Sequence, residues 1–280
     1  MKRILGWLAV LAFLCAPLSG TAELEVHFLN VGQGDCTIVM CDGEAMVIDG
    51  GPPGASDYVH AYIRNTLELD EVNTVISTHP HLDHVGGLAA VLNTVPVETV
   101  LTPVLEWDSR AFRRMMEYAD LSGAQVDVPL EGEYFPLGGA TVTVLHCWPE
   151  AMDLTEPDGK HYSRTNDTSI VVRIDYGDTA FIVTGDAEDY SEYMMIDSGM
   201  YLKADVLRVG HHGSRYSSTG EFLRAVQPAY AVISVAGDNG YGHPHPETLE
   251  RLERAGAKIL RTDELGTVVM ASNGKEVWVE

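Results

Sequence analysis

The chain has 280 residues, 45% of them hydrophobic, which is enough apolar material for a well-buried globular core. Its 41 acidic residues outnumber the 18 basic ones, so the formal net charge is −23 at pH 7. A broad surface for duplex DNA is therefore not expected, because such affinity comes largely from lysine and arginine neutralising phosphates. Two bound divalent cations would still attract a phosphate to a single spot.

The first 22 residues resemble a secretory signal peptide. Two basic residues precede an apolar run over residues 4–14, and Gly20-Thr21-Ala22 places small residues at the −3 and −1 positions of a cleavage site. The apolar run is too short for a comfortable membrane span, and no later segment approaches the required length. We expect residues 1–22 to be removed and residues 23–280 to form one hydrolase domain that works outside the cytoplasm.

The four cysteines do not form an obvious framework. Leu14 is too bulky to precede Cys15 in a lipidation signal, so no lipid anchor is expected there. Cys36 and Cys41 lie at opposite ends of one predicted strand and should not pair with each other. Either could pair with Cys147, and the sequence does not decide between them.

Short strands joined by tight turns and helices are predicted along the whole chain. Asp42-Gly43 is a hairpin signal, and Ser56-Asp57 is typical of a helix start. Strands are expected at residues 23–30, 36–41, 45–49, 72–77, 97–102, three times within 123–148, and at 168–176, 180–183, 206–209, 229–235, 258–261, 267–271 and 276–279. Helices are expected at residues 56–69, 83–93, 110–121, 188–197, 219–226 and 246–255. Strands that alternate with helices in two similar halves predict two sheets face to face with helices outside.

The densest chemistry lies in residues 78–87, with the sequence THPHLDHVGG. This run follows a predicted buried strand and places three imidazoles and a carboxylate within six positions. His79 and His81 can hold one divalent ion, while Asp83 and His84 reach toward a second. The two glycines that follow allow the backbone to pass close beneath such a site.

Two later strand ends carry further ligand types. Asp186 follows an apolar strand, and its two oxygens suit a bridge between two cations, although a helix N-cap is the alternative role. His211 and His212 also follow a strand. Because successive side chains of a strand point to opposite sides, we expect one of them to bind metal and the other to face substrate or support a ligand, without deciding which.

Other polar residues are expected around the ions. Asp49 ends a strand and is predicted to hold an imidazole from behind. His243 could contact a substrate phosphate or protonate a leaving group, or it could simply be a polar loop residue. Asn166 and Ser214 are further candidates for contacts with substrate.

The motifs together resemble the metallo-β-lactamase fold superfamily, in the branch that includes the extracytoplasmic domain of ComEC-type competence proteins. The matching segments span nearly the whole chain in the family's order: residues 28–35 (FLNVGQGD), 48–51 (IDGG), 78–87, 166–169 (NDTS), 184–188 (TGDAE), 209–214 (VGHHGS) and 241–244 (YGHP). The resemblance implies an α/β fold, an αββα sandwich of two mixed β-sheets with flanking helices. It also implies a two-metal site between the sheet edges and hydrolysis, most often of a phosphodiester.

Two departures from the family pattern matter. The usual third-motif histidine has no counterpart, since Asn166-Asp167 stands in that region, and one ion is then short of a protein ligand. The usual aspartate after Phe-Leu is Asn30. The competence proteins' membrane channel is not matched either, so DNA uptake is not implied.

These inferences define a hypothesis for function. Two divalent ions, Zn or Mn, would share a water molecule, lower its pKa and direct it at phosphorus, with Asp83, His212 and His243 as the catalytic candidates. The expected substrate is a small phosphodiester or a single-stranded nucleic acid. Hydrolysis of an ester, lactone or β-lactam on the same site is an alternative, and a non-catalytic metal-binding module is another.

Overall fold

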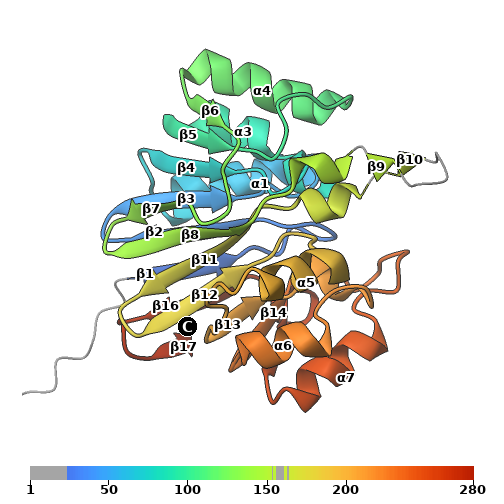
Figure 1. Ribbon diagram of the computed structural model, residues 1–280. Helices are drawn as coiled ribbons and strands as arrows, with labels where there is room; N and C mark the ends of the chain where they lie inside the picture. The colour runs from blue at the N-terminus through green and yellow to red at the C-terminus, as the bar shows by residue number, and fades with distance from the viewer. Residues whose placement is uncertain (1–23, 153, 156–160, 163) are drawn as a thin grey trace, which may run out of the picture.

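Two stacked β-sheets with helices on both outer faces make up the molecule (Figure 1). The computed structural model describes residues 24–152, 154–155, 161–162 and 164–280. The predicted signal peptide and Cys15 lie outside the described residues. None of the helices in this part of the chain is long and apolar enough to cross a membrane.

The first sheet contains eight strands in the order β17-β16-β1-β2-β3-β4-β5-β6. Their bounds are β1 Leu24–Phe28, β2 Thr37–Cys41, β3 Glu44–Ile48, β4 Val72–Ile76, β5 Val97–Leu101, β6 Gln125–Asp127, β16 Val268–Ser272 and β17 Val277–Val279. The predicted hairpin between β2 and β3 is confirmed. Asp42 and Gly43 both have positive φ, 49° and 88°, as the favoured two-residue hairpin turn requires.

The second sheet contains seven strands in the order β15-β14-β13-β12-β11-β8-β7. Their bounds are β7 Tyr134–Leu137, β8 Ala140–His146, β11 Val171–Tyr176, β12 Thr179–Val183, β13 Val206–Arg208, β14 Tyr230–Ile233 and β15 Lys258–Arg261. Strands β9 (Leu154–Thr155) and β10 (His161–Tyr162) form a separate two-stranded pair. Each main sheet mixes parallel and antiparallel neighbours.

Three apolar clusters account for the layers. One lies between the sheets and includes Phe28, Met46 and Ile174. The other two cover the outer faces, one beneath α1, α3 and α4 and the other beneath α5, α6 and α7. The helices are α1 Ser56–Ala61, α2 Leu82–Val85, α3 Leu88–Thr94, α4 Arg110–Ser122, α5 Asp189–Asp197, α6 Gly220–Val226, α7 Pro246–Arg254 and α8 Thr262–Leu265. This arrangement confirms the predicted αββα sandwich, and central strands such as β3 and β12 are almost wholly buried.

Two predicted helices differ from the structure. The helix expected over residues 56–69 is α1 followed by a π-helical turn, Tyr62–Thr66, and Ser56 does not cap it, since its hydroxyl donates back to the Pro53 carbonyl. The helix expected over residues 83–93 is split into α2 and α3. The break falls at Gly86 and Gly87. Position 87 requires glycine, because a Cβ there would collide with the carbonyl oxygen of Gly50.

The described cysteines form no disulfide. Cys36, Cys41 and Cys147 are buried free thiols. Cys36 lies in the cluster beneath α1, α3 and α4, whereas Cys41 and Cys147 lie between the sheets. The pairing that the sequence left open is therefore not formed.

Candidate metal centre

Two pairs of parallel strands, one pair from each sheet, end at the candidate centre. In the first sheet β3 lies beside β4, and Asp49 and His79 follow their carboxyl ends. In the second sheet β12 lies beside β13, and Asp186 and the histidine doublet follow theirs. Because the carboxyl ends of parallel strands meet at one edge of a sheet, residues distant in sequence converge there.

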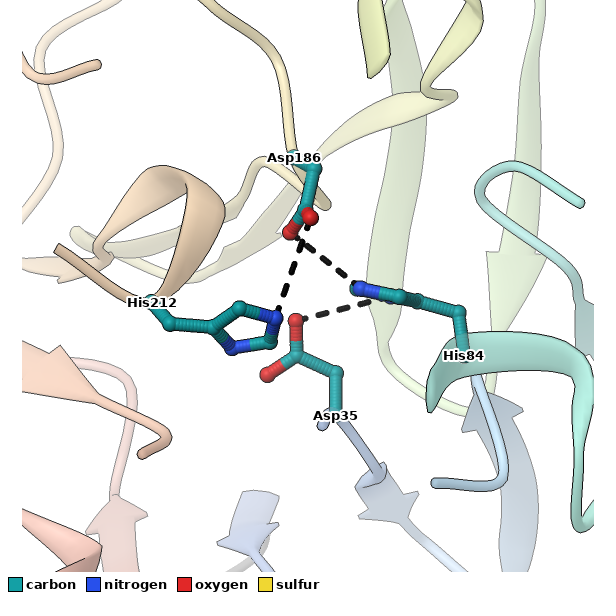
Figure 2. A group of neighbouring side chains, drawn as sticks. All are labelled: Asp35, His84, Asp186 and His212. Carbon is teal, nitrogen blue, oxygen red and sulfur yellow. Dashed lines mark ion pairs between the residues drawn. The ribbon is translucent and has the colours of Figure 1, made fainter. Parts of the chain in front are cut away.

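Asp186 faces several of the converging imidazoles, among them those of His84 and His212 (Figure 2). Its Oδ1 is 3.3 Å from Nε2 of His84, and its Oδ2 is 3.8 Å from Nε2 of His79. Nε2 of His79 is in turn 3.0 Å from Nδ1 of His81. Asp186 does not cap helix α5, whose N-cap residue is Glu188, so its carboxylate is free to face the imidazoles.

The structure corrects the prediction that His211 and His212 point to opposite sides. Strand β13 ends at Arg208, and both histidines adopt left-handed conformations with φ of 47° and 52°. As a result the Nε2 atoms of both rings lie 3.7 Å from Oδ2 of Asp186. The alternation that holds within a strand does not apply, because neither residue is in one.

Asp83 completes the set from the first sheet's side. Asp83 lies on the short helix α2 that also carries His84, and its Oδ2 is 3.4 Å from Nε2 of His212. The candidate ligands are therefore all brought together: His79, His81, Asp83, His84, Asp186, His211 and His212.

The spacing of these atoms fits metal ligation. Ligands at Zn–N distances of about 2.1 Å in a tetrahedral shell are separated from one another by about 3.4 Å. The observed separations, from 3.0 to 3.8 Å, bracket that value. Among the described residues, Nε2 of His84, Nε2 of His212 and Oδ1 of Asp186 are buried without a hydrogen-bond partner, which is costly unless a cation binds them.

Hydrogen bonds on the far side of each ring prepare the ring for a metal. Nδ1 of His84 lies 2.8 Å from Oδ2 of Asp49, and Nδ1 of His212 lies 2.9 Å from the carbonyl oxygen of Ser234. Carboxylate and carbonyl oxygens only accept, so each neutral ring carries its hydrogen on Nδ1 and leaves Nε2 as a lone pair directed at the centre. Asp49 also accepts from the amide and hydroxyl of Thr78, which fixes the carboxylate in place.

The pKa shifts of the clustered carboxylates and imidazoles indicate a centre that lacks positive charge. Burial raises the pKa of Asp186, but the surrounding imidazoles of His84, His212 and His211 outweigh it and hold that pKa well below its usual range. Burial opposes protonation of His84, yet the carboxylates of Asp186 and Asp49 raise its pKa well above the ordinary value. For His79 burial dominates, and the pKa is well below the ordinary value. The pKa of His211 is also raised, because the carboxylates of Asp186 and Glu188 outweigh its burial. Without an added cation, the carboxylates therefore favour protonated imidazoles at the centre.

A cavity of about 320 Å³ opens onto the centre. Its lining includes ligand candidates and residues that a substrate would meet: Gln33, His81, Leu82, Asp83, Asn166, Asp186, His211, His212, Tyr241 and His243. Leu82 and Tyr241 are largely exposed, at 55% and 69%, so the cavity has apolar groups beside its polar floor. Nδ1 of His243 is buried without a hydrogen-bond partner in the described structure, and the Tyr241 ring stacks on the imidazole.

Ser214 does not lie where the sequence suggested. Its side chain is buried, its hydroxyl accepts from the amide of Tyr216, and it is not among the residues that line the cavity. Its carbonyl accepts from the hydroxyl of Thr248, so Ser214 joins the histidine turn to helix α7. A contact between Ser214 and substrate has no geometric support.

Sequence reasoning missed three charged residues beside the centre. Asp35 groups with His84, Asp186 and His212, with one ligand atom of each within 4.8 Å of the others (Figure 2). Buried Arg208 forms an ion pair with Asp35 and donates to the carbonyl of Gly185. The signal for Arg208 was a cation in an otherwise apolar strand, because such a charge is almost never fully buried without a partner. The third residue, Glu188, accepts from both Asn166 and the ring of His211.

The family follows from a match to a sequence model. The model of the metallo-beta-lactamase superfamily matches residues 29–237, and the chain belongs to that superfamily. The metallo-beta-lactamase fold protein YhfI from Bacillus subtilis has the same fold, with a TM-score of 0.54 at 10% identity over 92% of this chain and all of that one. CmlA, a diiron beta-hydroxylase from Streptomyces venezuelae, aligns with a TM-score of 0.56 at 16% identity, covering 86% of this chain and 53% of its own. Identities this low show the fold alone.

Curated relatives include proteins named for competence. Competence protein ComA of Neisseria gonorrhoeae is 42% identical over 247 residues, covering 88% of this chain and 32% of the relative. ComE operon protein 3 of Bacillus subtilis (strain 168) is 28% identical over 292 residues, covering 95% of this chain and 36% of the relative. The chain thus spans about a third of the length of these relatives.

Proposed function

We propose that this protein is a two-metal hydrolase that cleaves phosphodiesters outside the cytoplasm. The observation that carries the proposal is the position of Asp186. Its Oδ2 lies 3.8 Å from Nε2 of His79 and 3.7 Å from Nε2 of His212, and its Oδ1 lies 3.3 Å from Nε2 of His84. A carboxylate in that position can bind two cations at once. Superfamily membership supports a metal-dependent hydrolase, and the predicted signal peptide supports the location.

The ligands divide by side of the centre. His79 and His81 would hold one ion, and Asp83, His84 and His212 would hold the other, with the carboxylate of Asp186 available to both. Zn²⁺ and Mn²⁺ both suit this mixture of imidazole and carboxylate. When bound, two such ions lower the pKa of a shared water molecule and stabilise charge on the transferring oxygens. Asp49 keeps the Nε2 lone pair of His84 available, because it accepts the hydrogen on Nδ1.

Two residues of the cavity are placed for the substrate. His243 lines the cavity, so its ring can contact a phosphate bound there. Burial and the neighbouring histidines lower its pKa to about 4, so it acts as a neutral donor near pH 7 and not as a reservoir of a second proton. The side-chain oxygen of Asn166 lacks a partner among the described residues, and its amide is held by Glu188.

The substrate is a small phosphodiester or a single strand of nucleic acid. With a net charge of −23, attraction must be confined to the ions, which favours a single phosphate over a long duplex. The competence proteins among the relatives favour nucleic acid. Exposed Tyr241 offers a flat apolar surface on which a base can stack.

The test is turnover by the metal-reconstituted protein. Single-stranded DNA, bis-p-nitrophenyl phosphate, an aryl ester and a β-lactam are offered with Zn²⁺ or Mn²⁺. Hydrolysis of the diesters is expected, together with its loss in an Asp83→Ala, Asp186→Ala double variant. Diester cleavage at the parental rate by that variant, or hydrolysis of the ester or β-lactam alone, would refute the proposal. Binding of two ions without any turnover would indicate a non-catalytic module.

A further inference from the structure

The turn that carries the two histidines has strained, left-handed backbone. His211 and His212 are consecutive non-glycine residues with positive φ, 47° and 52°. Left-handed backbone costs roughly 1 kcal/mol or more for each such residue, and that cost is tolerated where a side chain must be aimed. The turn is held by the amide of His211, which donates to Gly185, and by the amide of Ser214, which donates back to His211. Its effect is to direct both rings to Asp186.

His212 belongs with the ion on the Asp83 side. Its Nε2 is 3.4 Å from Oδ2 of Asp83, and its ring lies 5.3 Å from that of His84. This leaves the ring of His211 as an additional nitrogen beside Asp186. On the other side His79 and His81 supply only two imidazoles.

His211 is prepared in the same way as His84. Its Nδ1 lies 3.0 Å from Oε1 of Glu188, so the neutral ring keeps its hydrogen there and directs the Nε2 lone pair at Asp186. Glu188 is itself fixed, because Oε1 also accepts from Nδ2 of Asn166 at 2.9 Å and the backbone amide donates to Asp167 at 3.2 Å. A carboxylate behind a ring nitrogen is the usual support of a metal-binding histidine.

We propose that His211, with Glu188 as its positioning residue, supplies the third imidazole to the ion held by His79 and His81. The third-motif histidine that the family resemblance implies has no counterpart in this sequence, where Asn166-Asp167 stands in that region, and the side-chain amide of Asn166 donates to Glu188. The imidazole is thus recruited from the turn after β13. This inference rests on the proposed two-metal site but not on any substrate.

Titration of the metal-free protein with Co²⁺, followed by its d–d absorption, tests the assignment. The wild-type protein is expected to take up two equivalents. His211→Ala should weaken one equivalent by at least 10–100-fold and change its band intensity, while the other equivalent stays as in the wild type. His212→Ala should weaken the other equivalent. Glu188→Ala should weaken the same equivalent as His211→Ala, by about 10–100-fold, because it removes the Oε1 atom that accepts from Nδ1 of His211.

His60→Ala, which removes an exposed imidazole hydrogen-bonded to Thr94, is the control and should leave both equivalents unchanged. Circular dichroism of each variant establishes that it is folded. Two wild-type equivalents in His211→Ala, or equal weakening of both equivalents, would overturn the assignment. No substrate is present, so inactivity toward phosphodiesters would count against the proposed function alone.

Discussion

The two halves of the centre are built differently. The half from the first sheet places His79, His81, Asp83 and His84 within six consecutive positions of one turn. The half from the second sheet takes Asp186 from the end of β12 and the histidine doublet from the end of β13. The first half is a local motif, whereas the second exists only when two strands are paired in the correct register.

The two halves also differ in what stabilises them. The first is supported by close backbone packing at Gly50 and Gly87 and by the carboxylate of Asp49 behind one ring. The second contains strained backbone at the doublet and a fully buried cation, Arg208. We therefore expect substitutions in the second half to affect folding as well as ion binding, while substitutions in the first half affect mainly the ions.

The residue that faces both halves should have the largest effect. Asp186→Ala removes the carboxylate that faces both sides, so in the proposed two-metal site both ions would lose a ligand. Since such ions provide several kcal/mol of transition-state stabilisation, the rate of diester hydrolysis should fall by roughly 10³-fold or more. Steady-state kinetics and metal content measure this loss. Asp197→Ala, which removes an exposed carboxylate at the end of α5, should leave both unchanged, and a rate for Asp186→Ala within tenfold of wild type would contradict the expectation.

The buried cation should dominate the stability of the second half. Arg208→Met removes the guanidinium from the carboxylate of Asp35, whose side chain is only 4% exposed, and leaves it with the imidazole of His84 at 3.6 Å. Breaking a buried ion pair from one side typically costs about 3–5 kcal/mol in the free energy of unfolding. Urea unfolding of the metal-free protein measures this cost. The double variant Arg208→Met, Asp35→Asn should recover most of it, because no unpaired charge then remains.

The matched control for Arg208 is an exposed ion pair. Arg254 lies 2.8 Å from Glu250 on α7, with the two side chains 75% and 60% exposed. Arg254→Met should change the free energy of unfolding by less than about 1 kcal/mol. Equal costs for Arg208→Met and Arg254→Met would show that the buried cation contributes nothing special.

The first half of the centre could largely be predicted from the sequence, whereas much of the second half could not. The turn of residues 78–87 was predictable because its ligands are adjacent and their spacing alone restricts the chemistry. The position of Asp186 was predictable from the strand before it. The orientation of His212 was not, because it depends on left-handed backbone after β13 that alternation along a strand cannot predict. Arg208 and Asp35 were missed because their pairing spans 173 residues of sequence and appears only when the two sheets are stacked.

A buried carboxyl behind the second half should make its stability depend on pH. Glu192 of α5 accepts from the amides of Ser218 and Thr219, which follow the histidine turn. Burial raises its pKa to about 7, against 4.5 in an exposed carboxyl, although the two amides oppose the shift. The folded state therefore keeps a proton that the unfolded state has lost between pH 4.5 and about 7. The stabilisation due to Glu192 is fully present below that window and is lost as pH rises through it.

Glu192→Gln removes this titration. From pH 4.5 to 8, the free energy of unfolding of the wild type should fall relative to that of the variant by at most about 3 kcal/mol. Urea unfolding at intervals of one pH unit measures this change. Glu253→Gln, at an exposed position of α7, should differ from wild type by a constant amount. If the difference in free energy of unfolding between wild type and Glu192→Gln were also independent of pH, Glu192 would not make the stability of the second half depend on pH.

The smallest expected effect is that of Asp49→Asn in the first half, which changes the ring nitrogen of His84 that carries the hydrogen. Asp49 has a positive φ of 59°, which asparagine tolerates, so Asp49→Asn should leave the backbone unchanged. The two oxygens of Asp49 accept from Thr78 and from Nδ1 of His84. In the variant the oxygen is needed by the Thr78 amide, and the amide group of asparagine then faces Nδ1. His84 must accept there and carry its hydrogen on Nε2, the atom directed at Asp186.

The ion on the Asp83 side should therefore bind about 10–100-fold more weakly in Asp49→Asn, while the free energy of unfolding stays near wild type. Competition with a chelator measures the affinity, and ¹⁵N shifts of the imidazoles report which nitrogen of His84 is protonated. Asp70→Asn, at an exposed partner of Arg64, is the control. If Asp49→Asn instead destabilised the fold as strongly as Arg208→Met, the first half would depend on buried charge as much as the second, and the contrast between a local and an assembled half would concern sequence spacing alone.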